Sequence, residues 1–219
     1  WNPSPSFARA LAELKTSMPN AALYVHDPMW ASQAHEGAQM VNLSGVSTTL
    51  QLEKAKVIVS LDSDFLGTDG DTCFQTRGFT RGRQIDENPE LFNRLYSVEP
   101  RYTLTGTSAD HRLQIRGEQI GEFLAELAQA LKSKGVAVPA GAELPAAKLD
   151  AGVNSERAAK WIAAVTDDLI ANKGQSVVIV GNRQPAHVHA LGHLVNYMIG
   201  AYGKTISLSS SLDLPIQGD

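Results

Sequence analysis

Two aspartates directly follow a run of residues that is typical of a buried strand. The segment VIVSLDSDFLG, residues 57–67, begins with β-branched and small residues and then carries Asp62 and Asp64. A run without a polar face predicts a strand of a parallel sheet, and ligands bind outside the carboxyl ends of such strands. The pair could therefore act as general acid and base or hold a cation. Alternate residues of an extended segment point to opposite sides, which favours capping of turns and of the next helix.

Three histidines late in the chain have the residue type of metal ligands. His187, His189 and His193 fall within a predicted helix, in which successive side chains are about 100° apart. The apolar positions that mark the buried face of this helix are Val188, Leu191, Val195 and Met198. We expect His189 and His193 one turn apart on the opposite face, and no acidic residue lies close to them in sequence. Solvated or interface histidines are therefore favoured over a metal site.

Two further candidates for chemistry have less support. Asp110 and His111 are adjacent, but neighbours in sequence rarely face each other and no nucleophile is placed by spacing, so a structural turn is favoured. Cys73, the single cysteine, lies near Arg77, whose charge would lower the pKa of a thiol. Without a placed histidine partner, an inert thiol is favoured. The sequence has no dinucleotide fingerprint, phosphate loop, nucleophile elbow or zinc-protease motif.

The elements that must position these residues alternate between strand and helix. Strands are predicted at residues 21–26, 57–61, 94–98, 113–115, 176–180 and 205–208, and helices at 5–18, 31–41, 120–131, 155–173 and 185–199. A short helical approach is expected at 50–52 and a long loop with a helical turn or two at 67–90. This order predicts the α/β class, with a mainly parallel, Rossmann-like sheet and helices on both faces. We expect one domain over 1–219, with a candidate internal boundary near 135–150.

Composition narrows the function classes. The chain has 219 residues and a formal net charge of −4, which argues against a general nucleic-acid surface. No apolar run approaches the roughly 18 residues that a transmembrane helix needs. A single cysteine excludes an internal disulfide and a cysteine-held iron–sulfur cluster within this chain. Because the chain begins at Trp1 rather than Met, we expect a piece of a longer protein.

Three segments in order carry a resemblance to a known family. They are VIVSLDSDFLG (57–67), NRLYSVEPRYTLTGTSADHRLQIR (93–116) and SVVIVGNRQPAHVHALGHLVNYMIGAYGKT (176–205). Together they resemble the nucleotide-binding α/β domain of the molybdopterin oxidoreductase family. Within that family they are most similar to the molybdopterin-oxidoreductase-like domain of the iron–sulfur subunit of alternative complex III, a bacterial quinol:cytochrome c oxidoreductase.

The resemblance implies where a cofactor would lie. In the molybdenum enzymes of the family this domain binds the guanosine ends of a pterin cofactor, with strand-end loops taking phosphates and ribose. By position, Asp62 and Ser63 belong to the first such loop, and Glu99, Arg101 and Thr103 to the second. The family's small Gly-Asn pair is replaced here by Asp-Ser-Asp, and a carboxylate beside a pyrophosphate is repulsive. We therefore expect these five residues to be a vestigial site, with no catalytic or metal-binding residue.

The resemblance also implies a function and a setting. It predicts a non-catalytic scaffold domain of a membrane-associated, respiratory, quinol-oxidising iron–sulfur subunit, peripheral on the periplasmic side of the bacterial inner membrane. Iron–sulfur clusters are expected in the remainder of the protein, and cytochrome c and quinol-binding membrane subunits as partners. The region 67–90 and the His189/His193 face are the candidate contacts. Two alternatives remain: a true molybdenum domain binding molybdopterin guanine dinucleotide, and a small-molecule enzyme using Asp62, or Asp110 with His111.

Overall fold

The structure is a computed structural model that describes residues 4–22, 24, 32–84, 86, 92–146, 149 and 155–210. Its elements in chain order are α1 (Pro5–Ser17), α2 (Ser32–Met40), β1 (Val46–Leu50), the 3₁₀ turn η1 (Leu52–Lys54), β2 (Val57–Leu61), α3 (Thr72–Arg81), β3 (Arg94–Glu99), α4 (Leu104–Thr107), β4 (His111–Gln114), the 3₁₀ turn η3 (Gly117–Gln119), α5 (Ile120–Ser133), α6 (Ser155–Ala171), β5 (Ser176–Val180), α7 (Ala186–Met198) and β6 (Ile206–Ser210).

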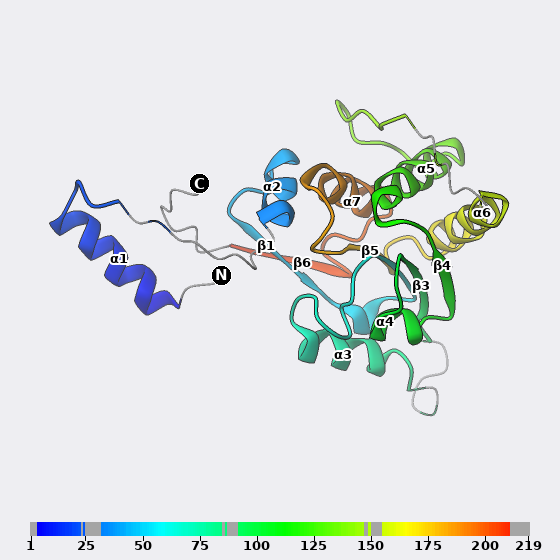
Figure 1. The fold of residues 1–219 in the computed structure, drawn as a ribbon, viewed down its shortest axis with the longest axis horizontal. Helices are drawn as coiled ribbons and strands as arrows, with labels where there is room; N and C mark the ends of the chain where they lie inside the picture. The colour runs from blue at the N-terminus through cyan, green and yellow to red at the C-terminus, as the bar shows by residue number, and fades with distance from the viewer. Residues whose placement is uncertain are drawn as a thin grey trace.

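Four strands form a parallel sheet in the order β4-β3-β2-β5. In the centre, Leu61 of β2 pairs with Val98 of β3 on one side and with Val180 of β5 on the other. All of β2 is buried, which explains a sequence without a polar face. Figure 1 shows α5 and α7 on one side of these strands and α3 on the other. The predicted α/β class, a mainly parallel Rossmann-like sheet with helices on both faces, is confirmed.

The helix α5 supplies much of the core. Its stripe Ile120, Phe123, Leu124, Leu127 and Leu131 is fully buried, as its helical spacing predicts. Trp161 of α6 joins this layer to the sheet, because its ring lies 5.5 Å from that of Phe123 and 5.1 Å from that of Tyr96 on β3. Edge-to-face aromatic pairs of this kind add about 0.5–1.5 kcal/mol each beyond their buried area.

The direction of the chain reverses beside β2. From β2 the chain adds β3 and β4 on one side, and it then crosses back to place β5 on the other side. In open parallel sheets, such a reversal leaves a crevice outside the carboxyl ends of the two strands that it separates. Asp62 directly follows β2, and Gly181 directly follows β5. The fold therefore positions the loops at 62–67 and 181–185 around one crevice.

A second, antiparallel sheet pairs β1 with β6. The sequence predicts β6 but not β1, whose residues Val46–Leu50 include Ser47, Thr48 and Thr49 and are mostly exposed. The predicted helix at 31–41 is confirmed as α2, which packs on α7. Of the predicted strand at 21–26, residues 23, 25 and 26 lie outside the described residues.

Within residues 67–90, predicted as a long loop with a helical turn or two, the structure has a longer helix than expected. Thr72–Arg81 form the helix α3, and the Asp71 side chain caps its start by accepting from the Phe74 amide at 3.2 Å. A helix of ten residues was not expected because Gly78 and three threonines have low helix propensity. Burial of Phe79 against Phe65, with ring centres 5.9 Å apart, supplies the tertiary stabilisation that propensity lacks.

The helix α1 forms where the sequence predicts it. The hydroxyl of Ser4 accepts from the Phe7 amide at 3.2 Å, and Pro5 occupies the first turn. None of its residues is buried, and in Figure 1 it lies apart from the sheet. No helix within the described residues is long and apolar enough to cross a membrane.

Candidate functional site

Asp62 sits at the crevice between β2 and β5. Its backbone φ is +53°, a left-handed conformation that aspartate tolerates better than most residues, and the side chain is 4% exposed. One carboxylate oxygen accepts from Arg183 Nη2 at 2.8 Å and the other from Gln184 Nε2 at 3.0 Å. The hydrogen bond to Asp62 raises the pKa of the Arg183 guanidinium. The negative charge of Asp62 is thus neutralised by the guanidinium of Arg183.

The two strand ends approach each other closely at Gly181. A Cβ at this position would lie 1.8 Å from the backbone oxygen of Asp62, so only glycine fits. The Gly181 amide donates to the Leu61 carbonyl at 2.9 Å, which continues the pairing of β2 with β5. The floor of the crevice is therefore closed by backbone rather than open between the strands.

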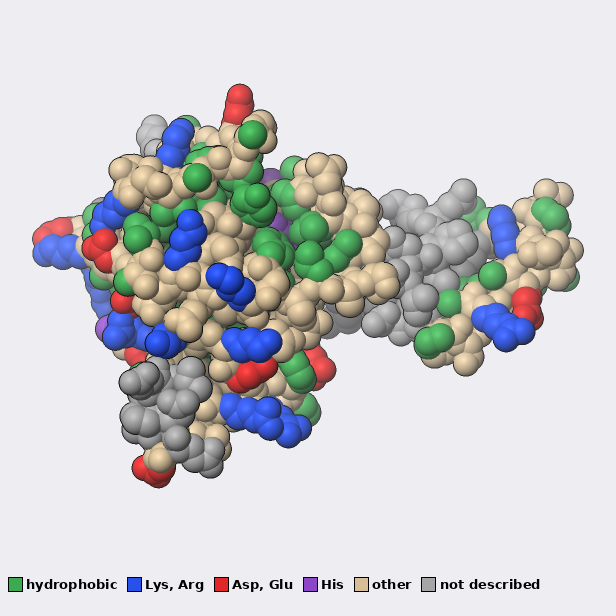
Figure 2. All heavy atoms as spheres, turned by 180° about the vertical axis from the view of Figure 1, so that it is seen from behind, with side chains coloured by type: hydrophobic (Ala, Val, Ile, Leu, Met, Phe, Trp, Pro, Cys, Tyr) green, Lys and Arg blue, Asp and Glu red, His purple; other side chains and the backbone are tan. Residues whose placement is uncertain are grey.

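A groove with a cavity of about 1230 Å³ begins at Asp62. Its walls come from η3 and α5, the connector at 142–146, α7, and residues 40–41 at the end of α2. Its apolar lining is Met40, Val41, Leu144, Val188, Leu191 and Leu194. Figure 2 shows the molecule from behind, with hydrophobic side chains gathered in several patches among basic ones. The groove exceeds the common size range of ligand pockets, which is about 300–1,000 Å³.

Ser63 and Asp64 turn away from this groove. The Ser63 carbonyl accepts from the Ser60 hydroxyl at 2.7 Å. Asp64 Oδ1 accepts from the amide and the hydroxyl of Thr105, at 3.0 and 3.1 Å. Asp64 therefore joins the loop after β2 to α4, and it does not share a ligand position with Asp62. The prediction that alternate residues diverge is confirmed by these contacts, although the Thr105 partner is distant in sequence.

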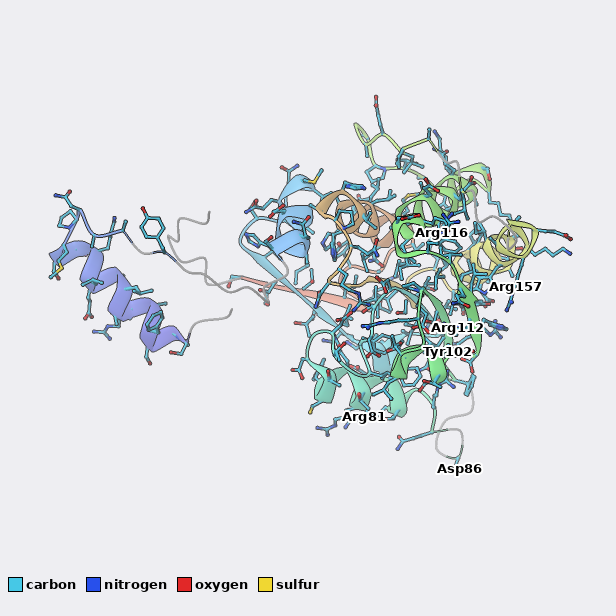
Figure 3. The ribbon with its side chains drawn as sticks, viewed as in Figure 1. Arg81, Asp86, Tyr102, Arg112, Arg116 and Arg157 are labelled. Carbon is cyan, nitrogen blue, oxygen red and sulfur yellow. The ribbon has the colours of Figure 1, made fainter. Side chains whose placement is uncertain are left out.

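The second predicted loop forms a separate network at the end of β3. Glu99 is almost fully buried and accepts from Thr103 Oγ1 and from Arg112 Nε, both at 2.6 Å. The Arg112 guanidinium lies 3.7 Å from the centre of the Tyr102 ring, and these two residues are labelled in Figure 3. Arg112 Nη2 is buried without a hydrogen-bond partner in the part of the chain that the structure describes. Arg101 is exposed.

Asp110 and His111 do not form a dyad. The Asp110 carboxylate accepts from Arg83 Nη1 at 3.2 Å and from the Leu95 amide at 2.8 Å. The His111 ring stacks on Tyr96 instead, with 4.7 Å between ring centres. These contacts support the structural-turn interpretation of the pair. Cys73 is exposed on α3.

The prediction that His189 lies opposite the buried face of α7, as a solvated or interface histidine, is wrong because the chain itself buries it. His189 is 6% exposed because α2 covers this face of α7, with Gly37 against its Cβ. Burial, together with the neighbouring His193, lowers the pKa of His189 to about 4. His193 is partly buried, its Nδ1 lies 2.7 Å from the Tyr202 hydroxyl, and burial lowers its pKa as well. His187 lies on the rim of the groove.

No group of three or more His, Cys, Asp or Glu side chains within the described ranges could hold a metal ion. His189 and His193 both border a second, smaller cavity of about 380 Å³ between α2, β1 and α7. Their ring nitrogens differ in surroundings: His193 has Tyr202 as a partner, whereas His189 Nε2 has none among the described residues. Because burial lowers the pKa of each ring, both imidazoles are neutral near pH 7.

Sequence reasoning missed the residues that neutralise the predicted carboxylates. Arg183 and Gln184 bind Asp62 from 121 and 122 positions away, and Arg112 binds Glu99 from 13 positions away. A partial signal existed for the first two, because Asp62 follows the end of β2 by one residue and Arg183 follows the end of β5 by three. Strands that pair in parallel bring such positions to the same edge of the sheet.

The residues at this edge do not fit the pyrophosphate of a pterin guanine dinucleotide. A bound pyrophosphate needs uncommitted donors and cations near it. Here Asp62, Asp64 and Glu99 are buried carboxylates, and Arg183 and Arg112 are already engaged with two of them.

No protein-family model matches the chain. No curated protein matches it either.

Proposed function

We propose that this chain is a non-catalytic scaffold domain of the molybdopterin-oxidoreductase type. It belongs, in this proposal, to an iron–sulfur subunit of a membrane-associated respiratory complex that oxidises quinol. The single observation that carries the proposal is the internal pairing at the crevice, where Asp62 is bound by Arg183 and Gln184. A domain that used this crevice for a dinucleotide would keep such donors for the phosphates.

The setting of the scaffold follows from the same proposal. The chain lies peripherally on the periplasmic side of the bacterial inner membrane, and its partners are cytochrome c and quinol-binding membrane subunits. The iron–sulfur clusters lie elsewhere in the same protein, because one cysteine cannot supply the four thiolates of a cluster. In this role the domain contributes surface and rigidity to an assembly rather than a reacting group.

The alternative is a molybdenum domain that binds molybdopterin guanine dinucleotide. Its support is the groove of about 1230 Å³, which starts at the topological position where α/β sheets bind nucleotides. In this alternative the exposed part of Arg183 would meet a phosphate, and Asp62 would have to release it.

Cofactor content distinguishes the two. The full-length protein is purified from cells supplied with molybdate, and molybdenum is measured by mass spectrometry and pterin by fluorescence after oxidative release. A molybdopterin guanine dinucleotide enzyme produced in the same cells is the control. We expect only trace molybdenum and pterin. Either one at a stoichiometric level rules out the scaffold proposal.

Assembly supplies a second test. Deletion of this domain from the full-length subunit is expected to lower the amount of assembled complex in the membrane. The rate of quinol oxidation per assembled complex, normalised to haem, is expected to stay near that of the wild type. A loss of rate in a fully assembled complex would contradict a purely structural role.

A further inference from the structure

Two hydrophobic surfaces of this chain are left uncovered within the described residues. The first is the stripe Leu11, Leu14 and Met18, which lies along α1 and extends into its C-cap. Leu14 is 43% exposed and Met18 is 59% exposed. The second is the groove, where Met40 is 62% exposed and Leu144 and Leu194 are partly exposed above the buried Val188. Exposed apolar side chains that gather in one place, rather than singly, often mark sites of association.

The apolar residues of α1 have the spacing of a helix that binds a groove. The spacing of residues 11, 14 and 18 is that of i, i+3 and i+7 anchors, by which an amphipathic helix binds a hydrophobic groove. The 13 residues of α1 span about 20 Å. Methionine occurs on both surfaces, Met18 on the helix and Met40 at the groove, and its flexible side chain adapts to irregular contacts.

The two surfaces also match in charge. The groove carries Glu118, Glu122 and Glu143, while Asp62 and Arg183 neutralise each other. On α1 the charged residues are Arg9, Glu13 and Lys15, which leave one net positive charge. An acidic wall attracts a helix with a net positive charge and repels phosphates and other anions.

We infer that the groove binds α1 of a second copy of this chain. Each copy inserts its α1 beside α5 and α7 of the other, so that the contact occurs twice about a two-fold axis. Reciprocal exchange of an identical element is a low-cost route to a dimer, because one pair of complementary surfaces is used two times. This inference goes beyond the proposed function, since a scaffold can be a monomer or a dimer, and it shares with that proposal only the pairing of Asp62 with Arg183.

Sedimentation of the full chain across a range of concentrations tests the exchange. The wild type is expected to dimerise, and Leu14→Glu to weaken the dimer at least about tenfold, because a carboxylate replaces an apolar anchor. Leu104→Glu is the matched control, since Leu104 is also exposed but belongs to α4. Circular dichroism checks that each variant keeps its helix content.

A charge exchange keeps the inference testable if Leu14→Glu disturbs α1 itself. Glu122→Lys and Lys15→Glu are each expected to weaken the dimer about fivefold, and the double variant to recover most of that loss. A wild type that stays monomeric at every concentration overturns the inference, including the case in which α1 folds back onto its own groove. A dimer that neither Leu14→Glu nor the charge reversals weaken also overturns it. Cofactor analysis of the same samples tests the proposed function separately.

Discussion

The ion pair between Asp62 and Arg183 is expected to contribute to the free energy of unfolding, and the substitution Arg183→Met tests this contribution. The substitution keeps a long apolar stem but removes the guanidinium. Asp62, at 4% exposure, then keeps Gln184 Nε2 as its remaining side-chain donor. Loss of one partner from a buried ion pair costs about 3–5 kcal/mol, whereas exposed pairs contribute about 0–1 kcal/mol. The Arg183 side chain is 44% exposed, so the expected cost lies between these limits, at about 2 kcal/mol.

A double-mutant cycle separates this cost from general damage. Asp62→Asn removes the charge and tolerates the left-handed backbone, since asparagine is common there. Arg183→Met is expected to cost about 0.5 kcal/mol in the Asp62→Asn background, because no carboxylate is left unpaired. The measurement is urea unfolding followed by circular dichroism. For a chain of this size, about 2 kcal/mol corresponds to roughly 4–8 °C in Tm.

Arg101→Met is the matched control, because Arg101 is exposed near the end of the neighbouring strand. Its expected effect is within about 0.5 kcal/mol of the wild type. The reasoning fails if Arg183→Met is as mild as this control. It also fails if Arg183→Met costs the same with and without Asp62→Asn, since the pair would then carry no coupling energy.

Three further predictions follow from the same contacts. Arg112→Met should cost about 3 kcal/mol in urea unfolding, more than Arg183→Met, because it leaves Glu99 charged and buried; an equal or smaller cost would contradict this ranking. Gly181→Ala should lower Tm sharply, because its Cβ would lie 1.8 Å from a backbone oxygen, whereas Gly117→Ala should be mild because its nearest neighbour is 3.9 Å away. For His189 the folded-state pKa of about 4 lies below its unfolded value, so the unfolded chain binds the extra proton and stability falls as pH drops from 6.5 towards 4. The loss between pH 6.5 and 5 should be about 1.5 kcal/mol and smaller in His189→Gln; equal slopes would refute the assignment.

The sheet and its helices were predictable because their signals are local. Runs such as residues 57–61 and 176–180 are β-branched without a polar face, and α5 has an unbroken helical stripe. The strand β1 gave no such signal, since its threonines face solvent and it exists only by pairing with β6, about 160 residues later. The length of α3 was underestimated because its stability comes from packing of Phe79 and not from its own propensities.

The site was only half predictable for a similar reason. Sequence position places Asp62 and Glu99 at the ends of neighbouring strands, which the structure confirms. The contacts of these carboxylates depend on segments that follow later in the sequence and fold back against them. Their partners Arg183 and Arg112 could therefore not be assigned from spacing alone. His189 shows the same limit, because helical geometry defines its face but not the α2 helix that covers that face.

Charge at the crevice determines which occupants the groove can accept. If Asp62 stood alone, it would repel phosphates and attract cations; if Arg183 stood alone, the reverse would hold. Their pairing cancels both effects at the strand ends, and the field in the groove is then set by the three glutamates on its walls. The proposed scaffold without an anionic cofactor and the proposed groove for a basic helix therefore rest on one arrangement of charges. Restoring an uncommitted cation, as Asp62→Asn does for Arg183, is the smallest change that would shift this groove back towards anions.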